Sequence, residues 1–566
     1  MKINKPSPPQ IYSSLELAES INKAPSILKF HIKNLEEQIH KLSEIGLALS
    51  REKDMNRLLE LILLEAKRIA NADAGTLYMA TDEQSLKFEI IMTDSLKFHM
   101  GGTSGKEIPF YPVKLYLENG EPNNHNVSAN VGLSGITLNI PDAYKAEGFD
   151  FSGAIAFDKK TGYRSKSFLT VPLKNHQDEI IGVLQLLNAQ DEKSGEIISF
   201  SKEIQDRVEA LSSQAAIAVT NKNLIRDLEN LFESFIKLIA SAIDSKSPYT
   251  GGHCARVPEI TMMLAEAVHN ESKGPFKDIK FTEKEMYELR IAAWLHDCGK
   301  VTTPEFVVDK STKLETIYDR VNEVETRFGV LKRDALIKNL KNELKIERNS
   351  DFSDEEKKDR IKILQGDYRN SIKNLDSDLE FIREANVGGE FMSGEKQDRI
   401  RNIAEYKWKP NGKMVNFLSQ NEIYNLCIPR GTLTPEERQI INDHIVMTIK
   451  MLETLPYPKH LKNVPEFAGG HHEKLDGTGY PKGLAKNDMS VQARIMAIAD
   501  IFEALTASDR PYKKGKTLSQ AMRILGFMKN DAHIDAELFE LFVQKKIYLQ
   551  YAEKNLDPSQ IDEVNI

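Results

Sequence analysis

Residues 471–481 combine side chains that packing alone does not require together. The run His471-His472-Glu473-Lys474-Leu475-Asp476-Gly477-Thr478-Gly479-Tyr480-Pro481 contains two adjacent imidazoles, two carboxylates and a Gly-Tyr-Pro turn. Imidazole and carboxylate ligands together suit iron, manganese, zinc or nickel. No cysteines recur at zinc-finger spacing. The run therefore predicts a metal site beside a shaped loop.

Five imidazole or carboxylate residues elsewhere in the chain are candidates for the same site. His296 and Asp297 end an apolar helical run, and Asp500 ends another. Burying a carboxylate costs free energy unless a cation or a donor meets it, so a metal ion is a natural partner. His253 and His444 lie in amphipathic helical patterns, where a hydrogen-bonded core histidine is the common alternative. Together, these positions indicate one shared site.

The order of these residues, with H-D-x-G-K at 296–300 and H-H-E-x-x-D-G-x-G-Y-P at 471–481, resembles the HD-GYP family of bacterial cyclic-dinucleotide phosphodiesterases. The resemblance covers roughly residues 244–545 and implies an all-helical domain with a two-metal centre that hydrolyses cyclic di-GMP. It implies that one metal is held by His253, His296, Asp297 and Asp500, and that Asp297 bridges to a second metal held by His444, His471 and His472. Iron is the expected metal, with manganese as the alternative.

The chemistry of such a centre is hydrolytic. Two metal ions about 3.5–4 Å apart can share a water, lower its pKa and stabilise the entering and leaving oxygens at phosphorus. Asp297 and Lys300 are therefore the predicted catalytic residues. The predicted substrate-binding residues are Lys300, Gly479, Tyr480, Arg510 and Lys513. Solvated basic side chains and a packed loop aromatic are the structural alternatives.

The expected products are linear pGpG or, after a second cleavage, GMP. Tyr249 favours two metals rather than three, because the resemblance implies an acidic ligand there in three-metal members, and a phenol with a pKa of about 10 is a poorer ligand. No identified residue reads a base edge, so another cyclic dinucleotide, such as cyclic GMP-AMP, is the alternative substrate. A receptor with negligible turnover is a third interpretation, which the complete ligand set disfavours.

Composition indicates a globular protein without a membrane span. The chain has 566 residues, of which 40% are hydrophobic and 28% charged, and its net charge of -8 argues against nonspecific binding to a nucleic-acid polymer. The longest apolar run, 58–66, is interrupted by Glu60 and Glu65. The three cysteines form no disulfide framework. We expect a cytoplasmic protein.

The first half of the chain has patterns typical of a mixed α/β domain. Residues 35–49 predict an entry helix, and strand-like runs follow at 75–79 and 88–92. Three later segments resemble a GAF domain of the cyclic-nucleotide phosphodiesterase type: 138–144, 157–173 and 181–188. The resemblance implies a sensor with a six-stranded sheet and a pocket for an unknown small ligand.

The identity of that ligand stays open. Nucleotide-binding members of the family tend to carry Asp-Glu where this chain has Asp158-Lys159. Asn139 and Asp158 are candidates for contact with the ligand, and the structural alternative is that they cap turns.

Two heptad patterns join the halves of the chain. Ile204, Val208, Leu211, Ala215 and Ala218 form the first, and Ile225, Leu228, Phe232, Phe235 and Ile239 resume it after a phase change near Lys222. This predicts a helical connector and a parallel homodimer stalk. The alternative is an amphipathic helix packed on its own domain.

A charged insertion separates the two halves of the metal-ligand pattern. More than a hundred residues lie between Lys313-Leu314 and Gly431. A 4-3 spacing from Ile317 to Ala335, followed by Glu/Lys/Asp-rich segments over 339–409, predicts a helical hairpin or coiled coil. The simplest interpretation of the charged residues is that they form a solvated face. The functional interpretation is that the insertion forms a lid or a dimer contact.

The predicted architecture is a multidomain α+β chain with an α/β GAF sensor, a long connector helix and an all-α HD-GYP domain that carries a helical insertion. The predicted segments are an N-terminal segment and entry helix at 1–44, the GAF domain at 45–200, the connector at 201–243, the HD-GYP domain at 244–545 with the insertion at about 315–428, and a C-terminal tail at 546–566.

Overall fold

The computed structural model describes residues 26–246, 252–389, 391–508 and 515–565. Three residues with predicted roles, Tyr249, Arg510 and Lys513, lie outside this range. The chain divides into two compact units, Met1–Asn230 and Leu231–Ile566. Among the described residues, no helix is both long and apolar enough to cross a bilayer.

The N-terminal unit is built on an antiparallel sheet with the strand order β3-β2-β1-β7-β6-β5. These strands are β1 (Ala72–Thr81), β2 (Ser85–Thr93), β3 (Phe98–Gly101), β5 (Leu138–Ile140), β6 (Phe168–Lys174) and β7 (Ile180–Gln190). The short strands β4 (Val113–Lys114) and β8 (Ile197–Ile198) pair with β2 and β7. The runs predicted at 75–79 and 88–92 lie within β1 and β2 and are confirmed. The sheet has eight strands instead of the six predicted, because β4 and β8 pair with strands of the six-stranded path.

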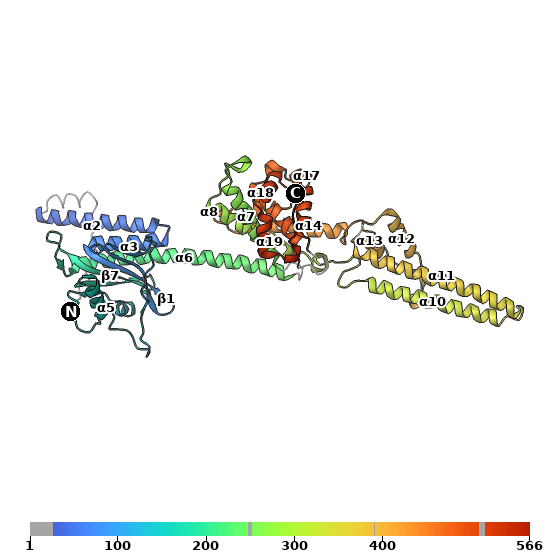
Figure 1. The fold of residues 1–566 in the computed structure, drawn as a ribbon, viewed down its shortest axis with the longest axis horizontal. Helices are drawn as coiled ribbons and strands as arrows, with labels where there is room; N and C mark the ends of the chain where they lie inside the picture. Colours follow the sequence, from blue (N-terminus) through green and yellow to red (C-terminus); the bar gives the residue numbers. More distant parts are fainter. Residues whose placement is uncertain (1–25, 247–251, 390, 509–514, 566) are drawn as a thin grey trace, which may run out of the picture. The chain divides into compact units, whose positions relative to one another are not determined.

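Helices pack on both faces of this sheet. α2 (Ser26–Arg51), α3 (Met55–Ala70) and the start of α6 (Lys202–Lys246) share an apolar core with one face (Figure 1). The short helices α4 (Val127–Ser134) and α5 (Ser152–Thr161) pack on the side toward which Tyr78 and Phe168 point. α2 confirms the predicted entry helix.

Asp158 and Asn139, the two positions considered for ligand contact, both have partners inside this unit. The buried Asp158 carboxylate accepts hydrogen bonds from Ser165 N and Ser165 Oγ, both at 2.8 Å, and from Tyr144 Oη at 2.5 Å. Asn139 Nδ2 donates to Phe200 O at 3.0 Å. Both side chains therefore hold loops of the unit together.

The C-terminal unit is mostly helical, as predicted. Its main helices are α7 (His253–Asn270), α8 (Glu283–Leu295), α14 (Pro435–Glu453), α15 (Val464–Gly469), α16 (Val491–Thr506), α17 (Leu518–Asn530), α18 (Ala536–Gln544) and α19 (Ile547–Asn555). They share one apolar core, in which Met496, Phe502 and Phe542 are fully buried. The N-termini of α8 and α14 are fixed by capping boxes.

α6 is a continuous helix of 45 residues, so the phase change near Lys222 does not interrupt it. Val208 and Leu211, predicted as part of a dimer seam, are buried in the core of the N-terminal unit. That part of the seam prediction is wrong, because the apolar residues are already covered within the chain. Ile236 and Ala240 are buried in the core of the C-terminal unit, so the phase change marks a change of packing partner.

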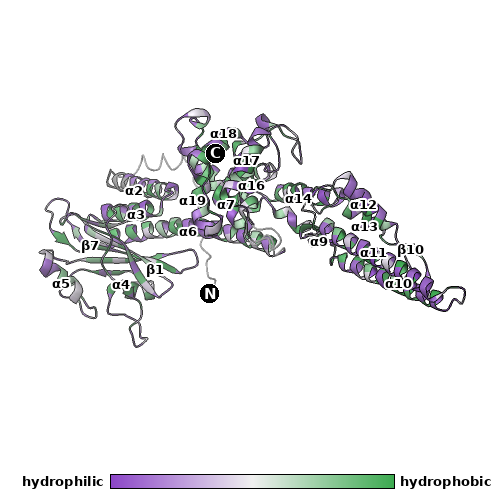
Figure 2. Cartoon of the chain, turned by 45° about the vertical axis from the view of Figure 1, so that its right-hand side comes forward, coloured by the Kyte–Doolittle hydropathy of each residue, from purple (hydrophilic) through white to green (hydrophobic). Residues whose placement is uncertain are grey.

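The insertion contains a helical hairpin, as predicted. α10 (Val321–Glu347) packs against α11 (Asp354–Val387) (Figure 1), and Figure 2 shows hydrophilic and hydrophobic residues mixed along both. The remaining elements are α12 (Gly394–Ala404), β9 (Lys407–Trp408), β10 (Val415–Asn416) and α13 (Gln420–Leu426). Phe328, Ile382 and Phe417 are among the residues of a separate apolar core.

The start of the hairpin differs from the prediction. Ile317, expected on the helical seam, lies before α10 and is 94% exposed. Asp319 Oδ1 accepts a hydrogen bond from Val321 N at 2.9 Å, which holds the turn that precedes the helix. The 4-3 spacing therefore extended one turn too far toward the N-terminus.

Lys313 is expected to make the stability of the insertion depend on pH. Burial lowers the pKa of this lysine to about 8, below its ordinary value of 10.5, and Nζ donates to Leu426 O at 3.0 Å and Ile428 O at 2.8 Å. Between these two pH values the unfolded chain binds more protons than the folded one. The free energy of unfolding should therefore rise with pH over this window, by at most about 1.4 kcal/mol per pH unit.

Trp408 packs against the core of the insertion, so its fluorescence in a Trp294→Phe background, which removes the other of the two tryptophans, can follow unfolding in urea from pH 7 to pH 10.5. Lys313→Met should abolish the rise, and Lys341→Met, at an exposed position of α10, should preserve it. An equal slope in both variants would contradict the assignment to Lys313.

Candidate metal centre

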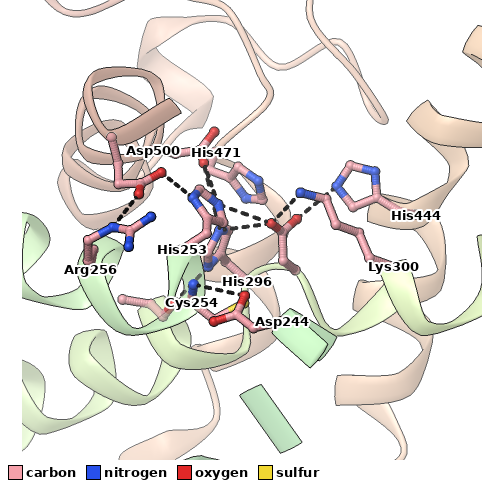
Figure 3. Close-up of polar contacts among 12 residues, drawn as sticks. Asp244, His253, Cys254, Arg256, His296, Lys300, His444, His471 and Asp500 are labelled. Atoms are coloured by element: carbon pink, nitrogen blue, oxygen red, sulfur yellow. Dashed lines mark hydrogen bonds and ion pairs between the residues drawn. The ribbon is translucent and has the colours of Figure 1, made fainter. Parts of the chain in front are cut away.

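The seven predicted metal ligands converge in the C-terminal unit. Helix ends and helix interiors place them: His253 begins α7, His296 follows α8, Asp297 precedes the 3-10 turn η2 (Cys298–Thr302), His444 lies in α14, His471 and His472 follow α15, and Asp500 lies in α16. All seven side chains are buried or nearly so. Figure 3 shows five of them labelled, together with Lys300.

Asp297 lies between two groups of imidazoles. Its Oδ2 lies 3.2 Å from His253 Nε2 and 3.3 Å from His296 Nε2. Its Oδ1 lies 3.1 Å from His444 Nε2. Asp500 Oδ1 is 3.2 Å from His253 Nε2, on the first side. The two oxygens of one carboxylate therefore face different groups, which is the arrangement of a bridging ligand.

The ligand atoms form three overlapping sets, each with its atoms within 4.8 Å of one another. These sets are His253-His296-Asp500, His444-His471-His472 and His296-Asp297-His471. The first two share no residue, and the third, which contains Asp297, shares His296 with the first and His471 with the second. The described residues thus offer two neighbouring positions for metal ions.

The backbone fixes which nitrogen of the histidines faces the centre. The Nδ1 atoms of His296 and His471 hydrogen-bond the carbonyl oxygen three residues earlier, at 2.7 and 2.6 Å, and His444 does the same. Because a carbonyl oxygen can only accept, Nδ1 carries a proton, so that whenever the ring is neutral Nε2 presents a lone pair to the centre. This is the tautomer that binds metals.

Three buried atoms of the centre have no hydrogen-bond partner among the described residues: Asp297 Oδ1, His444 Nε2 and His471 Nε2. Nearly all buried polar atoms in native proteins are satisfied. Asp297 Oδ1 and the lone pair of His444 Nε2 are two acceptors 3.1 Å apart, an arrangement that a cation between them stabilises. Nitrogen and oxygen ligands of this kind fit a divalent metal ion such as iron, manganese, zinc or nickel.

Glu503 also belongs to the centre, although it is not among the residues predicted from the sequence. Its side chain is 1% exposed. One oxygen contacts His253 Nδ1, and the other accepts a hydrogen bond from Arg256 Nε at 2.7 Å. A carboxylate behind a ligating imidazole orients the ring and increases its basicity. A signal was present, because Glu503 lies one turn after Asp500 in the same apolar helix.

The two groups of imidazoles differ in protonation. Burial alone lowers the pKa of His296, but the neighbouring Asp297 and Asp500 carboxylates together outweigh burial and raise it to about 9. On the other side, burial lowers the pKa of His472 to about 4 and holds that of His471 well below its usual range. His471 and His472 are therefore neutral at pH 7, whereas the first group shares protons with carboxylates that a bound cation would displace.

Gly299, the glycine of the H-D-x-G-K motif, brings Asp297 close to His444. A Cβ atom at this position would lie 1.9 Å from His444 O. Gly299 N donates a hydrogen bond to Thr448 Oγ1 at 2.9 Å. The absence of a side chain thus allows η2 to lie directly against α14.

The 471–481 loop is shaped by its glycines and by Glu473. A Cβ atom on Gly479 would lie 2.3 Å from Lys474 N, so the backbone passes closely over itself. The buried Glu473 carboxylate accepts hydrogen bonds from Lys482 N at 2.7 Å and Leu484 N at 2.9 Å. Glu473 therefore closes the loop and does not face the metal ligands.

Tyr480 and Lys300 lie next to the ligands. The Tyr480 ring stacks on that of His472 with the centroids 4.9 Å apart, and burial raises the pKa of its phenol to about 12. Lys300 Nζ donates to Asp297 Oδ2 at 2.6 Å, and its side chain is 27% exposed. Lys300 therefore offsets the charge of the bridging carboxylate at the edge of the centre.

Two family models match the chain. A model described as a GAF domain matches residues 54–219, and a model described as an HD domain matches residues 420–538. The second match begins after the hairpin of the insertion and includes His444, His471, His472 and Asp500.

Curated relatives match the chain over shorter segments. A cyclic di-GMP phosphodiesterase of Pseudomonas aeruginosa is 46% identical over 114 residues, which is 20% of this chain and 26% of the relative. A cyclic di-GMP phosphodiesterase of Thermotoga maritima is 36% identical over 119 residues, 21% of this chain and 32% of the relative. A 3'3'-cGAMP-specific phosphodiesterase of Vibrio cholerae is 33% identical over 139 residues, 24% of this chain and 29% of the relative.

The chain thus spans less than a third of the length of each of these three relatives. Among solved structures, the GAF domain of an Acinetobacter phosphoenolpyruvate-protein phosphotransferase aligns with a TM-score of 0.25 and 16% identity. It covers 34% of this chain and 98% of that domain.

Proposed function

We propose that this chain, in which a GAF domain precedes an HD domain, is a metal-dependent phosphodiesterase that hydrolyses cyclic di-GMP. The observation that carries the proposal is the position of Asp297, whose two oxygens face two separate groups of buried imidazoles. The identity of part of this chain to cyclic di-GMP phosphodiesterases supports the choice of substrate.

The proposed ligand assignment follows the two groups. His253, His296, Asp297 and Asp500 would hold one divalent ion, and Asp297, His444, His471 and His472 the other. Iron is the proposed metal, and manganese the alternative. When bound, the two ions supply an activated water and neutralise charge at phosphorus.

The chain's own residues would position the substrate and exclude water. Tyr480 borders the centre with its ring held against His472, and Gly479 keeps that loop close to Glu473. Lys300 holds Asp297 and presents a fixed positive charge beside a phosphate. Arg510 and Lys513 are proposed as further phosphate contacts. The proposed product is pGpG, with GMP after a second cleavage.

A second candidate substrate is cyclic GMP-AMP, because relatives named as 3'3'-cGAMP-specific phosphodiesterases match part of the chain at 33 and 42% identity. Purified protein loaded with iron or manganese under anaerobic conditions should be incubated with each cyclic dinucleotide, and the products separated by chromatography. Preferential release of pGpG would support the main proposal, and preferential cleavage of cyclic GMP-AMP the second. Binding without turnover of either would contradict both and indicate a receptor.

We further propose a cytoplasmic homodimer regulated by a small ligand of the GAF domain. α6 carries a stripe of exposed apolar residues at alternating spacings of three and four: Leu224, Leu228, Leu231, Phe235 and Leu238, each at least 54% exposed. Asn221, also exposed, continues the stripe toward Ile217. A single Asn in such a seam favours one register of a parallel pair. A second copy of α6 is the proposed occupant.

Changing Leu228 and Leu231 to Glu is expected to dissociate this dimer. Each leucine contributes about 1.5–3 kcal/mol when buried, so the double variant should weaken dimerisation more than about 100-fold. Sedimentation equilibrium over a range of protein concentrations measures the effect. Glu229→Gln, on the same helix outside the stripe, is the control, and unchanged association of the double variant would refute the stripe as the interface.

A further inference from the structure

We propose that the C-terminal end of α6 positions the metal centre through Asp244 and Lys246, which we call the α6 clasp. The inference rests on the proposed function, in which α6 connects a sensor to a phosphodiesterase. The two residues lie in the last turn of α6. Each contacts a different segment that carries proposed metal ligands.

Lys246 holds the turn that follows Asp297. Its Nζ donates to Lys300 O at 3.2 Å and Thr303 O at 2.6 Å, and also to Val301 O. A lysine ammonium has three N–H donors, so these three carbonyls use all of them. The ammonium thereby fixes the path of η2, between the bridging carboxylate at its start and Thr303 at its end.

Asp244 holds the start of α7. Its carboxylate accepts hydrogen bonds from Gly252 N at 3.1 Å and Cys254 N at 3.3 Å, on either side of His253 (Figure 3). A carboxylate at a helix N-terminus satisfies N–H groups that have no partner within the helix. The orientation of His253 therefore depends on the position of α6.

The clasp cannot move independently of α6. Asp244 is buried beside Ile243, and Ile236, Ala240 and Ile243 pack into the core of the C-terminal unit. A rotation or translation of the end of α6 would displace both clasp residues together. Either η2 and the start of α7 follow, which moves Asp297 and His253 relative to the ligands on α14 and α16, or the clasp bonds break.

Lys246→Met should loosen the first proposed metal position without unfolding the domain, because Met keeps most of the apolar stem. We expect affinity for Mn²⁺ in metal-depleted protein, measured by electron paramagnetic resonance, to fall about 10- to 100-fold, the usual effect of residues behind metal ligands. Hydrogen exchange at the amides of Gly299, Lys300 and Thr303 should accelerate, while α16 keeps its protection. Lys237→Met, whose ammonium lies 3.8 Å from Glu233 on the same helix, is the control.

A purely structural role for Lys246 would lower protection throughout the core and leave Mn²⁺ affinity unchanged in the folded fraction, and that result would overturn the proposal. Asp244→Asn is the second variant. It should weaken Mn²⁺ binding while accelerating exchange at Cys254 instead of Gly299. Neither measurement uses a nucleotide, so both stand if the proposed substrate is wrong.

The coupling role is tested by combining Lys246→Met with one Ala inserted after Lys222, which changes the helical phase by about 100°. In the otherwise unchanged chain the insertion should alter Mn²⁺ affinity at least about tenfold. In the Lys246→Met background it should alter affinity less than about twofold, the scatter expected of independent sites. Additive effects, or no effect of the insertion in the unchanged chain, would overturn the clasp as the route of coupling. Failure of the full protein to cleave any cyclic dinucleotide would instead contradict the proposed function.

Discussion

Asp297→Ala is expected to reduce hydrolysis of the cyclic dinucleotide at least about 100-fold, the scale of removing one electrostatic contact to a transition state. The carboxylate contacts both groups of imidazoles, so its loss should release metal from both positions and not from one. Elemental analysis after anaerobic purification should show substantially less than one ion for each site. Steady-state turnover measures the loss of activity.

The fold should survive this change, because the apolar core around Met496 and Phe502 does not depend on Asp297. Circular dichroism and thermal unfolding will show whether it does. Asp443→Ala is a matched control, since Asp443 is exposed, adjacent to His444 and hydrogen-bonded to Gln439 at 2.8 Å. Near-normal turnover of Asp297→Ala with full metal content would exclude a two-metal mechanism.

Glu503→Gln is expected to lower metal affinity about 10- to 100-fold. Glutamine keeps the shape of the side chain but not the charge that faces His253 and Arg256. Turnover should therefore be restored by excess Mn²⁺, which distinguishes a role behind the ligand from a role in the chemical step. A metal titration of activity measures both quantities.

Glu540→Gln, at an exposed position of α18, is the control for Glu503→Gln and should titrate like the unchanged protein. An activity deficit of Glu503→Gln that no concentration of metal repairs would falsify the assigned role. It would indicate that Glu503 acts on the substrate or the fold directly.

The ligands of the centre could be proposed from sequence because two short motifs hold most of them. His296 and Asp297 are adjacent in one motif, and His471 and His472 are adjacent in the other. Glu503 has no motif, and only its position in an apolar helix marks it. The contacts of Asp244 and Lys246 could not be predicted, because their partners are backbone N–H and C=O groups. Backbone groups are the same in nearly every residue, so the sequence does not mark them.

The connector shows a different limit of sequence reasoning. Its heptads predicted a helix, and α6 is one. The same helix, however, packs Val208 into one core and Ile236 into another, and leaves Leu228 exposed. Heptad spacing identifies apolar faces but does not say which partner covers each face. The predicted dimer seam therefore mixed residues that belong to different surfaces.

The ends of the insertion meet, and this has a consequence for how the metal centre assembles. Lys313 Nζ reaches Ile428 O, 115 residues later, and Lys310 Nζ reaches Glu437 Oε2 at 2.8 Å. Once the insertion has folded on its own core, the chain between Asp297 and His444 behaves as a short loop. The segments that then separate these two residues are 298–309 and 438–443, which have 12 and 6 residues, or 18 together. Each doubling of the length of a flexible loop adds only about 0.6 kcal/mol to the free energy of closing it. The insertion could therefore be longer with little effect on the free energy of bringing Asp297 and His444 together.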